Sequence, residues 1–91
     1  MRVKILAILR QLVGAREIEV GLKVGDTVGS VLARLAADYP ALGERILDDH
    51  GNLETFINVF VSGRSIRFLD GLNTSLNEGH VLAIVPPVGG G

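Results

Sequence analysis

The residues with the clearest chemical signature stand at the end of the chain, in the segment Pro86-Pro87-Val88-Gly89-Gly90-Gly91. The prolines lack an amide hydrogen and favour an extended path, and the glycines have no side chain to place in a core. This composition predicts a tail that leaves the domain and threads a narrow channel, where glycine permits close backbone approach. Six extended residues span roughly 20 Å, enough to carry a terminal carboxylate into a partner's buried site. The alternative is a frayed end without a function.

Other residue types that could do chemistry have weaker support. Asp48-Asp49-His50 holds possible metal ligands, but adjacent residues rarely converge on one ion without partners elsewhere, which favours a solvated loop. His80 follows a turn glycine and is expected on the surface of a strand. No serine lies in a Gly-x-Ser-x-Gly context, and no phosphate-binding glycine loop is present. The sequence therefore predicts neither a catalytic residue nor a metal site.

Length and composition narrow the class of protein. With 91 residues the chain forms one small domain, and 47% hydrophobic against 21% charged residues is typical of a folded one. A net charge of −1 argues against nucleic acid as a partner, and two arginines near Phe68, Arg64 and Arg67, suit acidic groups on a protein at least as well. There is no cysteine, and the longest apolar runs, five residues each, are too short to cross a membrane. We expect a cytoplasmic carrier, modifier or interaction module.

Hydrophobic spacing predicts the elements of the first half. Residues 2–10 alternate as a strand that is apolar on both faces in its middle, and residues 17–22 alternate as its hairpin partner across a short turn with Gly14. Residues 28–39 carry an apolar stripe at helical spacing, with Asp26 or Thr27 as the cap. A short helical turn over residues 42–47 precedes a polar loop.

Strand character returns in the second half. Residues 56–61 alternate, a short segment around residues 66–68 follows a tight turn, and residues 80–85 form the last strand. This order predicts an α+β domain over residues 1–85, in which a mixed sheet of four to five strands has one main helix packed on one face, followed by a flexible extended tail over residues 86–91.

Apolar residues exceed what one helix can cover. Leu6, Ile8, Phe56 and Phe60 cannot all be buried if each strand shows one face to the core. We expect a hydrophobic patch on the open face of the sheet, where a partner docks through Leu6, Phe56, Phe60 and Val85 while the tail inserts. The alternative is that some of these residues pack beneath residues 65–76.

Several segments carry a family resemblance over essentially the whole chain: Leu9 to Gly14, Phe56 to Gly63, Ile66 to Thr74, and Glu78 to Gly91. Together they resemble the ubiquitin-like sulfur carriers of the MoaD/ThiS type, which have the β-grasp fold. The resemblance implies that Gly91 is adenylated by a ubiquitin-activating-like adenylyltransferase, which uses ATP, and then becomes a thiocarboxylate. The chain itself would bind no cofactor and would be a substrate of that enzyme rather than a catalyst.

The resemblance leaves the acceptor of the sulfur open. The ending Pro-Pro-Val-x-Gly-Gly resembles the small subunit of molybdopterin synthase and implies the large subunit as a partner, in molybdenum cofactor biosynthesis. The stretch from Glu44 to Thr74 is more similar to carriers for cysteine synthesis and implies a cysteine-synthase-type acceptor, while thiamine biosynthesis fits less well. A protein modifier joined through Gly91 to lysines, or an interaction domain whose tail is merely flexible, are the rival hypotheses.

Overall fold

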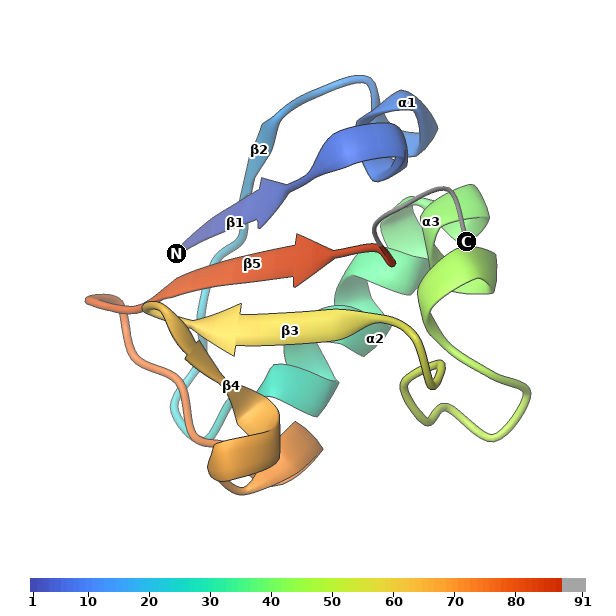
Figure 1. Ribbon diagram of the computed structural model, residues 1–91. Helices are drawn as coiled ribbons and strands as arrows, with labels where there is room; N and C mark the ends of the chain where they lie inside the picture. Colours follow the sequence, from blue (N-terminus) through green and yellow to red (C-terminus); the bar gives the residue numbers. More distant parts are fainter. Residues whose placement is uncertain (88–91) are drawn as a thin grey trace.

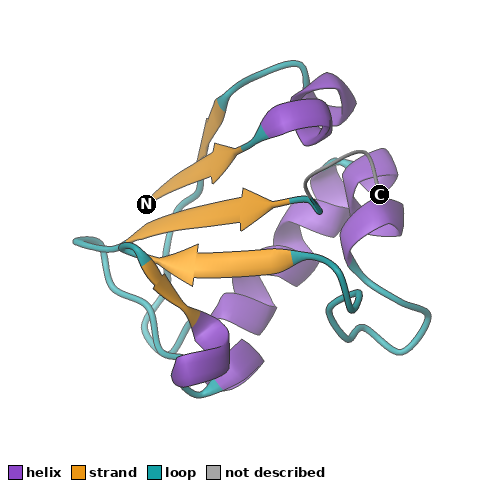
Figure 2. Ribbon diagram, viewed as in Figure 1, coloured by secondary structure: helices purple, strands orange, loops and turns teal. Residues whose placement is uncertain are grey.

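The computed structural model describes residues 1–87, which form a five-stranded sheet with its two longest helices on one side (Figures 1 and 2). The strand order is β2-β1-β5-β3-β4, with β1 and β5 parallel and the other pairs antiparallel. The elements are β1 (Arg2–Ile5), α1 (Arg10–Val13), β2 (Glu17–Glu19), α2 (Val28–Asp38), α3 (Pro40–Ile46), β3 (Asn58–Val61), β4 (Arg64–Ser65) and β5 (Val81–Val85). The predicted α+β class and mixed sheet are confirmed.

The first strand is shorter than the alternation predicts. β1 ends at Ile5, and residues 7–13 turn into a 3-10 helix (Ala7–Leu9) followed by α1. Ala7 has a φ of 52°, which no strand can accommodate, and the turn that follows folds Leu9 into the core with none of its surface exposed. The predicted strand over residues 2–10 was therefore wrong beyond Ile5, although β1 does pair antiparallel with β2 as expected.

The strands of the second half are also shorter than predicted. The Ile57 amide donates to the Glu54 carbonyl oxygen at 3.1 Å, and this turn delays the start of β3 from residue 56 to residue 58. β4 has only two residues, and the segment predicted as a strand around Ile66 and Phe68 is instead a 3-10 helix, Ile66–Phe68. Within the described residues no helix has the length and apolar character that crossing a membrane requires.

The helix α2 begins as its sequence predicts. Thr27 is the N-cap, and its hydroxyl oxygen accepts from the Ser30 amide at 3.2 Å while the Ser30 hydroxyl oxygen accepts from the Thr27 amide at 2.8 Å. The predicted stripe is buried at Val28, Val31, Leu32 and Leu35. Asp26, one residue earlier, accepts hydrogen bonds from the Lys23 amide, the Ser30 hydroxyl and the Arg34 guanidinium. The start of α2 is thus tied to the loop that precedes it.

The bonds to Asp26 make the stability of this helix start depend on pH. The Arg34 guanidinium, with the Lys23 amide and the Ser30 hydroxyl, holds the pKa of Asp26 well below its usual range. A depressed folded-state pKa contributes stability above the unfolded value, about 3.9, and that contribution is lost as the pH falls toward the folded value. We expect Asp26→Asn to lower the melting temperature near pH 7 and to have a smaller effect near pH 2. Asp49→Asn, an exposed aspartate, is the control, and equal effects of Asp26→Asn at both pH values would contradict the assignment.

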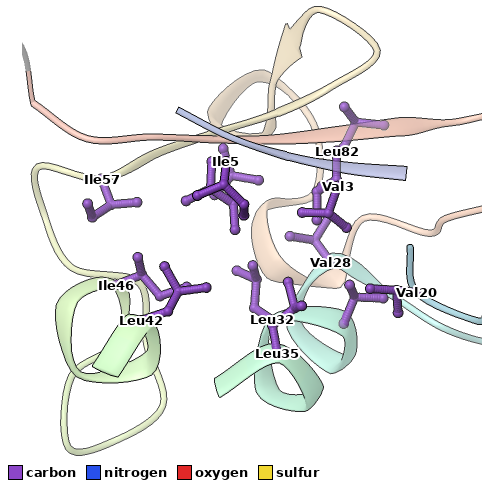
Figure 3. Packing of buried hydrophobic residues seen from close by; sticks show 14 of the residues in the cluster. Val3, Ile5, Val20, Val28, Leu32, Leu35, Leu42, Ile46, Ile57 and Leu82 are labelled. Atoms are coloured by element: carbon purple, nitrogen blue, oxygen red, sulfur yellow. The ribbon is translucent and has the colours of Figure 1, made fainter. Parts of the chain in front are cut away.

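The core lies between the sheet and the helix pair α2–α3 (Figure 3). Val3 and Ile5 of β1, and Leu82 and Ile84 of β5, have no exposed surface, and they face the buried residues of the two helices. The other side of the sheet has no helix over it, and in Figure 1 this open face is turned toward the viewer. The side chains on the open face of β1, β3 and β5 therefore do not belong to the core between the sheet and the helices.

The two helices meet where Gly43 of α3 lies against Ala36 of α2. A Cβ atom built on Gly43 would come within 2.7 Å of the Ala36 Cβ, a distance that real contacts do not reach. We expect Gly43→Ala to push the helices apart and to cost about 1–3 kcal/mol of unfolding free energy, measured by chemical denaturation. Gly21→Ala is the matched control, because nothing lies within 4 Å of a Cβ at that position. Equal stabilities of the two variants would show that the close approach is not required.

Candidate functional site

The candidate site is the end of the sheet from which the tail departs. β5 ends at Val85, after which Pro86 is buried and Pro87 is exposed. Both prolines line a hollow of about 170 Å³, together with Leu9, Arg45, Glu54, Phe56 and Ile57. The other tail residues that the sequence singles out, Val88, Gly89, Gly90 and Gly91, lie outside the described residues.

The centre of the open face is apolar. Phe60 of β3 pairs with Ala83 of β5, and Ala83 pairs in turn with Lys4 of β1, so the three form one row across the sheet. The neighbours of these residues along each strand, such as Val59 and Ile84, are buried against the helices, which places the row on the opposite, open face. Phe60 is therefore a half-buried aromatic residue on the face of the sheet that no helix covers.

The structure brings three of the four predicted docking residues together. Val85 pairs with Asn58 on the same face as Phe60, and the Leu6 amide donates to the Ile84 carbonyl oxygen at 3.3 Å, which places Leu6 beside the end of β5. Phe56 lies apart from them in the turn before β3. It is 73% exposed and borders the hollow at the base of the tail. Leu6, Phe60 and Val85 thus lie close together, and Phe56 lies apart from them beside the start of the tail.

Sequence reasoning missed a group of cations beside Leu6. Lys4, Arg10 and Arg16 surround a hollow of about 360 Å³ that Leu6 also lines, with Glu17 as the one acidic residue of its lining. The Arg10 Nε donates to the Ile5 carbonyl oxygen at 2.8 Å, which fixes the start of that side chain against β1. In the predicted strand over residues 2–10, Lys4 and Arg10 would lie far apart. The turn at Ala7, which the alternating pattern did not predict, brings Arg10 back to the end of β1. This edge suits acidic side chains on a partner.

Asp48 and His80, which the sequence analysis considered as possible functional residues, form hydrogen bonds within loops. The Asp48 carboxylate accepts from the amides of His50 and Asn52, at 2.8 and 2.9 Å, and so closes the loop between α3 and β3. The His80 Nδ1 accepts from the Asn77 amide at 3.2 Å in the turn before β5. Over residues 1–87, histidine, aspartate and glutamate side chains do not gather in groups of three as a metal site would require.

Comparison with known proteins supports a family for this architecture. The model of the ThiS family matches residues 3–91. Small archaeal modifier protein 3 of Haloferax volcanii is 35% identical over 91 residues, which cover 100% of this chain and 98% of that protein. The sulfur carrier protein CysO of Mycobacterium tuberculosis is 39% identical over 69 residues, which cover 74% of each chain.

Solved structures of such proteins have the same fold. The crystal structure of SAMP1 from Haloferax volcanii superposes with a TM-score of 0.87 at 34% identity, over 99% of this chain and 97% of the other. A chain of the BexX/CysO complex of Amycolatopsis orientalis superposes with a TM-score of 0.83 at 31% identity, over 99% of this chain and 98% of that one. The predicted β-grasp, ubiquitin-like fold is confirmed.

Proposed function

The chain belongs to the ThiS family of ubiquitin-like sulfur carriers, and from this we propose that its terminal Gly91 carries sulfur as a thiocarboxylate. A free carboxylate is a poor electrophile, because its negative charge repels a nucleophile and its oxide is a poor leaving group. Adenylation removes both obstacles: a sulfide-level sulfur nucleophile attacks the carbonyl carbon, the bond from that carbon to the phosphate oxygen breaks, AMP leaves with the electron pair, and the thiocarboxylate remains. In this proposal Gly91 is a substrate, and the rest of the chain presents it to the enzymes that act on it.

The observation that carries the proposal is the continuity between the open face and the tail. Phe60, Val85 and Leu6 lie on one uncovered surface, and Pro86 and Pro87 continue directly from its central strand. A protein that covers this face receives the tail at a set place and in a set direction. This is the arrangement a carrier needs, because its reacting group has to reach a site that belongs to another protein.

Two kinds of partner follow from the proposal. The first is a ubiquitin-activating-like adenylyltransferase that binds and uses ATP, since this sequence holds no phosphate-binding glycine loop of its own. The second is an acceptor that removes the sulfur. The cations Lys4, Arg10 and Arg16 beside Leu6 favour partners whose contact surface is acidic next to the entrance for the tail. Such ATP-dependent activation suits the cytoplasm.

We propose the large subunit of molybdopterin synthase as the acceptor, with this chain as the small subunit. The support is the ending Pro86-Pro87-Val88-Gly89-Gly90-Gly91. A second candidate, a cysteine-synthase-type acceptor, is favoured by the 39% identity to the sulfur carrier protein CysO. Purification of the chain with its bound partners and their identification by mass decides between the two, and recovery of only a pyridoxal-phosphate enzyme would rule out the first.

A modifier role is favoured by a different observation, the full-length similarity to small archaeal modifier protein 3. Both roles begin with the same acyl-adenylate, so the products have to be compared. Intact mass of the chain expressed with its native partners tests the proposal: sulfur in place of one terminal oxygen indicates a carrier, and conjugates on other proteins indicate a modifier. An unchanged Gly91 would refute activation altogether.

A further inference from the structure

The two arginines beside Phe68 differ in their surroundings. The Arg67 guanidinium donates to the Thr55 carbonyl oxygen at 2.9 Å, which ties the 3-10 helix Ile66–Phe68 to the turn before β3. Arg64 is exposed at the start of β4, and the ion pairs formed within residues 1–87 do not include it. Of the two cations, Arg64 is therefore the one that is left for a ligand.

Arg64 borders a hollow of about 380 Å³ at the end of the sheet opposite the tail. The Ser62 amide donates to the Val81 carbonyl oxygen at 2.8 Å, so the turn between β3 and β4 meets the loop before β5 at this end (Figure 1). The tail leaves from the other end of β5. The lining of the hollow consists of Val61, Ser62, Arg64, Leu69, Thr74 and His80.

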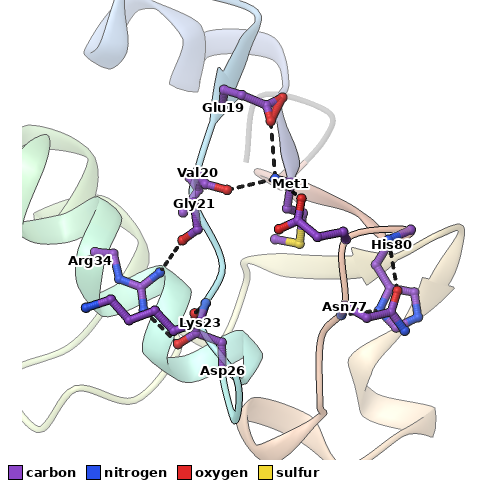
Figure 4. A network of polar contacts seen from close by, with 11 residues as sticks. Met1, Glu19, Val20, Gly21, Lys23, Asp26, Arg34, Asn77 and His80 are labelled. Atoms are coloured by element: carbon purple, nitrogen blue, oxygen red, sulfur yellow. Dashed lines mark hydrogen bonds and ion pairs between the residues drawn. The ribbon is translucent and has the colours of Figure 1, made fainter.

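Two other polar residues of the lining each keep a hydrogen that can be donated to a ligand. The His80 Nδ1 accepts from the Asn77 amide at 3.2 Å, so the hydrogen of the neutral ring is on Nε2 (Figure 4). The Ser62 hydroxyl oxygen accepts from the Val81 amide at 3.2 Å, and its own hydrogen is left to donate. Together with Arg64, these residues offer donors from three sides of the lining to one acceptor.

The acidic residues nearest in the sequence do not neutralise the hollow. Asp70 and Glu78 stand close to lining residues along the chain, but neither borders the hollow. The Glu78 carboxylate pairs with the Met1 amine at 3.5 Å, and that amine also pairs with Glu19 at 3.2 Å (Figure 4). The hollow is thus lined by cationic and neutral residues only, which suits an anionic group.

An apolar surface adjoins these donors. Val61 and Leu69 supply the aliphatic part of the lining, and Phe68, which precedes Leu69, is 84% exposed. Exposed aromatic side chains next to apolar hollows are typical of protein–protein contacts. A small free anion would use only the donors, whereas a polypeptide with an acidic and an apolar side chain side by side would use both parts of this surface.

We propose that the hollow binds a segment of another protein in which an acidic side chain stands next to an aromatic or aliphatic one. The carboxylate accepts hydrogen bonds from Arg64, His80 and Ser62, and the apolar side chain packs against Leu69 and Phe68. The inference goes beyond the proposed function, because it involves neither the terminal glycine nor the open face. Since the hollow and the tail lie at opposite ends of the sheet, one molecule can hold this segment while its tail is inside an enzyme.

The experiment selects binders from a random peptide library on the immobilised full-length chain and then titrates a selected peptide in solution. We expect the enriched peptides to contain an acidic residue adjacent to an aromatic or aliphatic one. In NMR spectra the amide signals of Ser62 and Leu69 should shift, and those of Phe60 and Ala83 on the open face should not. The same peptide with its acidic residues replaced by the corresponding amides should bind more weakly.

Variants of the chain test which residues make the contact. Arg64→Glu should raise the Kd of the selected peptide roughly tenfold or more, and Phe68→Ser should also raise it. Arg16→Glu is the matched control, because it makes the same change of charge at an exposed arginine of the cationic hollow beside Leu6. We expect this control to bind the peptide as the unaltered chain does. Equal melting temperatures of the three variants would exclude unfolding as the cause of a loss.

Several results would overturn the inference. Equal weakening by Arg64→Glu and Arg16→Glu would indicate a general attraction between charges. A selection that enriches no acidic peptide, or peptides that shift the signals of Phe60 instead, would exclude the hollow as their site. A single-stranded RNA oligonucleotide that shifts the Ser62 signal at lower concentrations than the peptide would indicate nucleic acid as the partner. Each of these results leaves the sulfur-carrier proposal intact, because none of them measures Gly91.

Discussion

A chain shortened by Gly90 and Gly91 is expected to fold normally and to lose activation completely. All members of the hydrophobic cluster precede Val85, and the last buried residue of the described chain is Pro86, so the deletion removes no described packing. It does withdraw the terminal carboxylate by roughly 7 Å. A reacting carbon displaced so far cannot meet an ATP phosphate held in a partner's site. Exchange of pyrophosphate with ATP, measured with the activating enzyme, and the intact mass of the chain both report the loss.

Binding provides the control for this truncation. If the open face does the docking, the shortened chain should still bind the activating enzyme, which distinguishes lost chemistry from lost recognition. A melting temperature many degrees lower would mean that the last two residues are structural. Adenylation of the shortened chain at the normal rate would mean that the position of the carboxylate does not matter. Either result would refute the proposed role of the tail.

Phe60→Asp is expected to have the second largest effect, on partner binding. Phe60 is the aromatic residue of the row that crosses the open face, flanked by Ala83 of β5 and Ser65 of β4. Burial of a charge there opposes docking, and loss of a central aromatic anchor alone costs about 2 kcal/mol or more, roughly a 30-fold rise in Kd. Isothermal titration of the chain into the activating enzyme measures this change.

The matched control places the same charge where no docking is expected. Val24→Asp adds an aspartate at a fully exposed apolar residue in the loop between β2 and α2. We expect this variant to bind the activating enzyme as the unaltered chain does, and both variants to unfold at similar denaturant concentrations. Equal weakening by both substitutions would indicate a general effect of charge, and unchanged binding of Phe60→Asp would exclude the open face as the docking surface.

Local patterns in the sequence predicted the two longest helices, α2 and α3, better than the ends of the strands or the short helical segments at residues 7–13 and 66–68. α2 follows from its apolar spacing and its Thr27 cap, since both act within a few residues of one another. β1 was predicted too long because Ile8 and Leu9 continue an apolar run, while the break depends on the positive φ of Ala7 and on the burial of Leu9 against distant residues. Such contacts depend on the tertiary fold and do not produce a repeating hydrophobic pattern in the sequence.

Some parts of the candidate site could be predicted from the sequence, and others depend on the tertiary fold. The tail and the apolar excess around Phe60 could be predicted, because unusual composition and surplus hydrophobic residues are visible without a structure. The cations around Leu6 could not, since Arg10 reaches Lys4 only through the turn at Ala7. The enclosure of the Met1 amine by Glu19 and Glu78 was also missed, because those residues are far apart in the sequence and meet only when β2 and the turn before β5 flank β1.

The central position of β5 has a consequence for biosynthesis. β5 is the last strand to be translated, yet it separates β1 from β3, the two strands on either side of it in the sheet. A nascent polypeptide that ends before Val81 leaves both of those strands with an unpaired edge, and the row from Phe60 through Ala83 to Lys4 does not exist in it. The sheet is therefore completed only after the residues of β5 have been synthesised. The surface proposed for docking is therefore displayed only by molecules that already contain β5, the strand that leads to the tail.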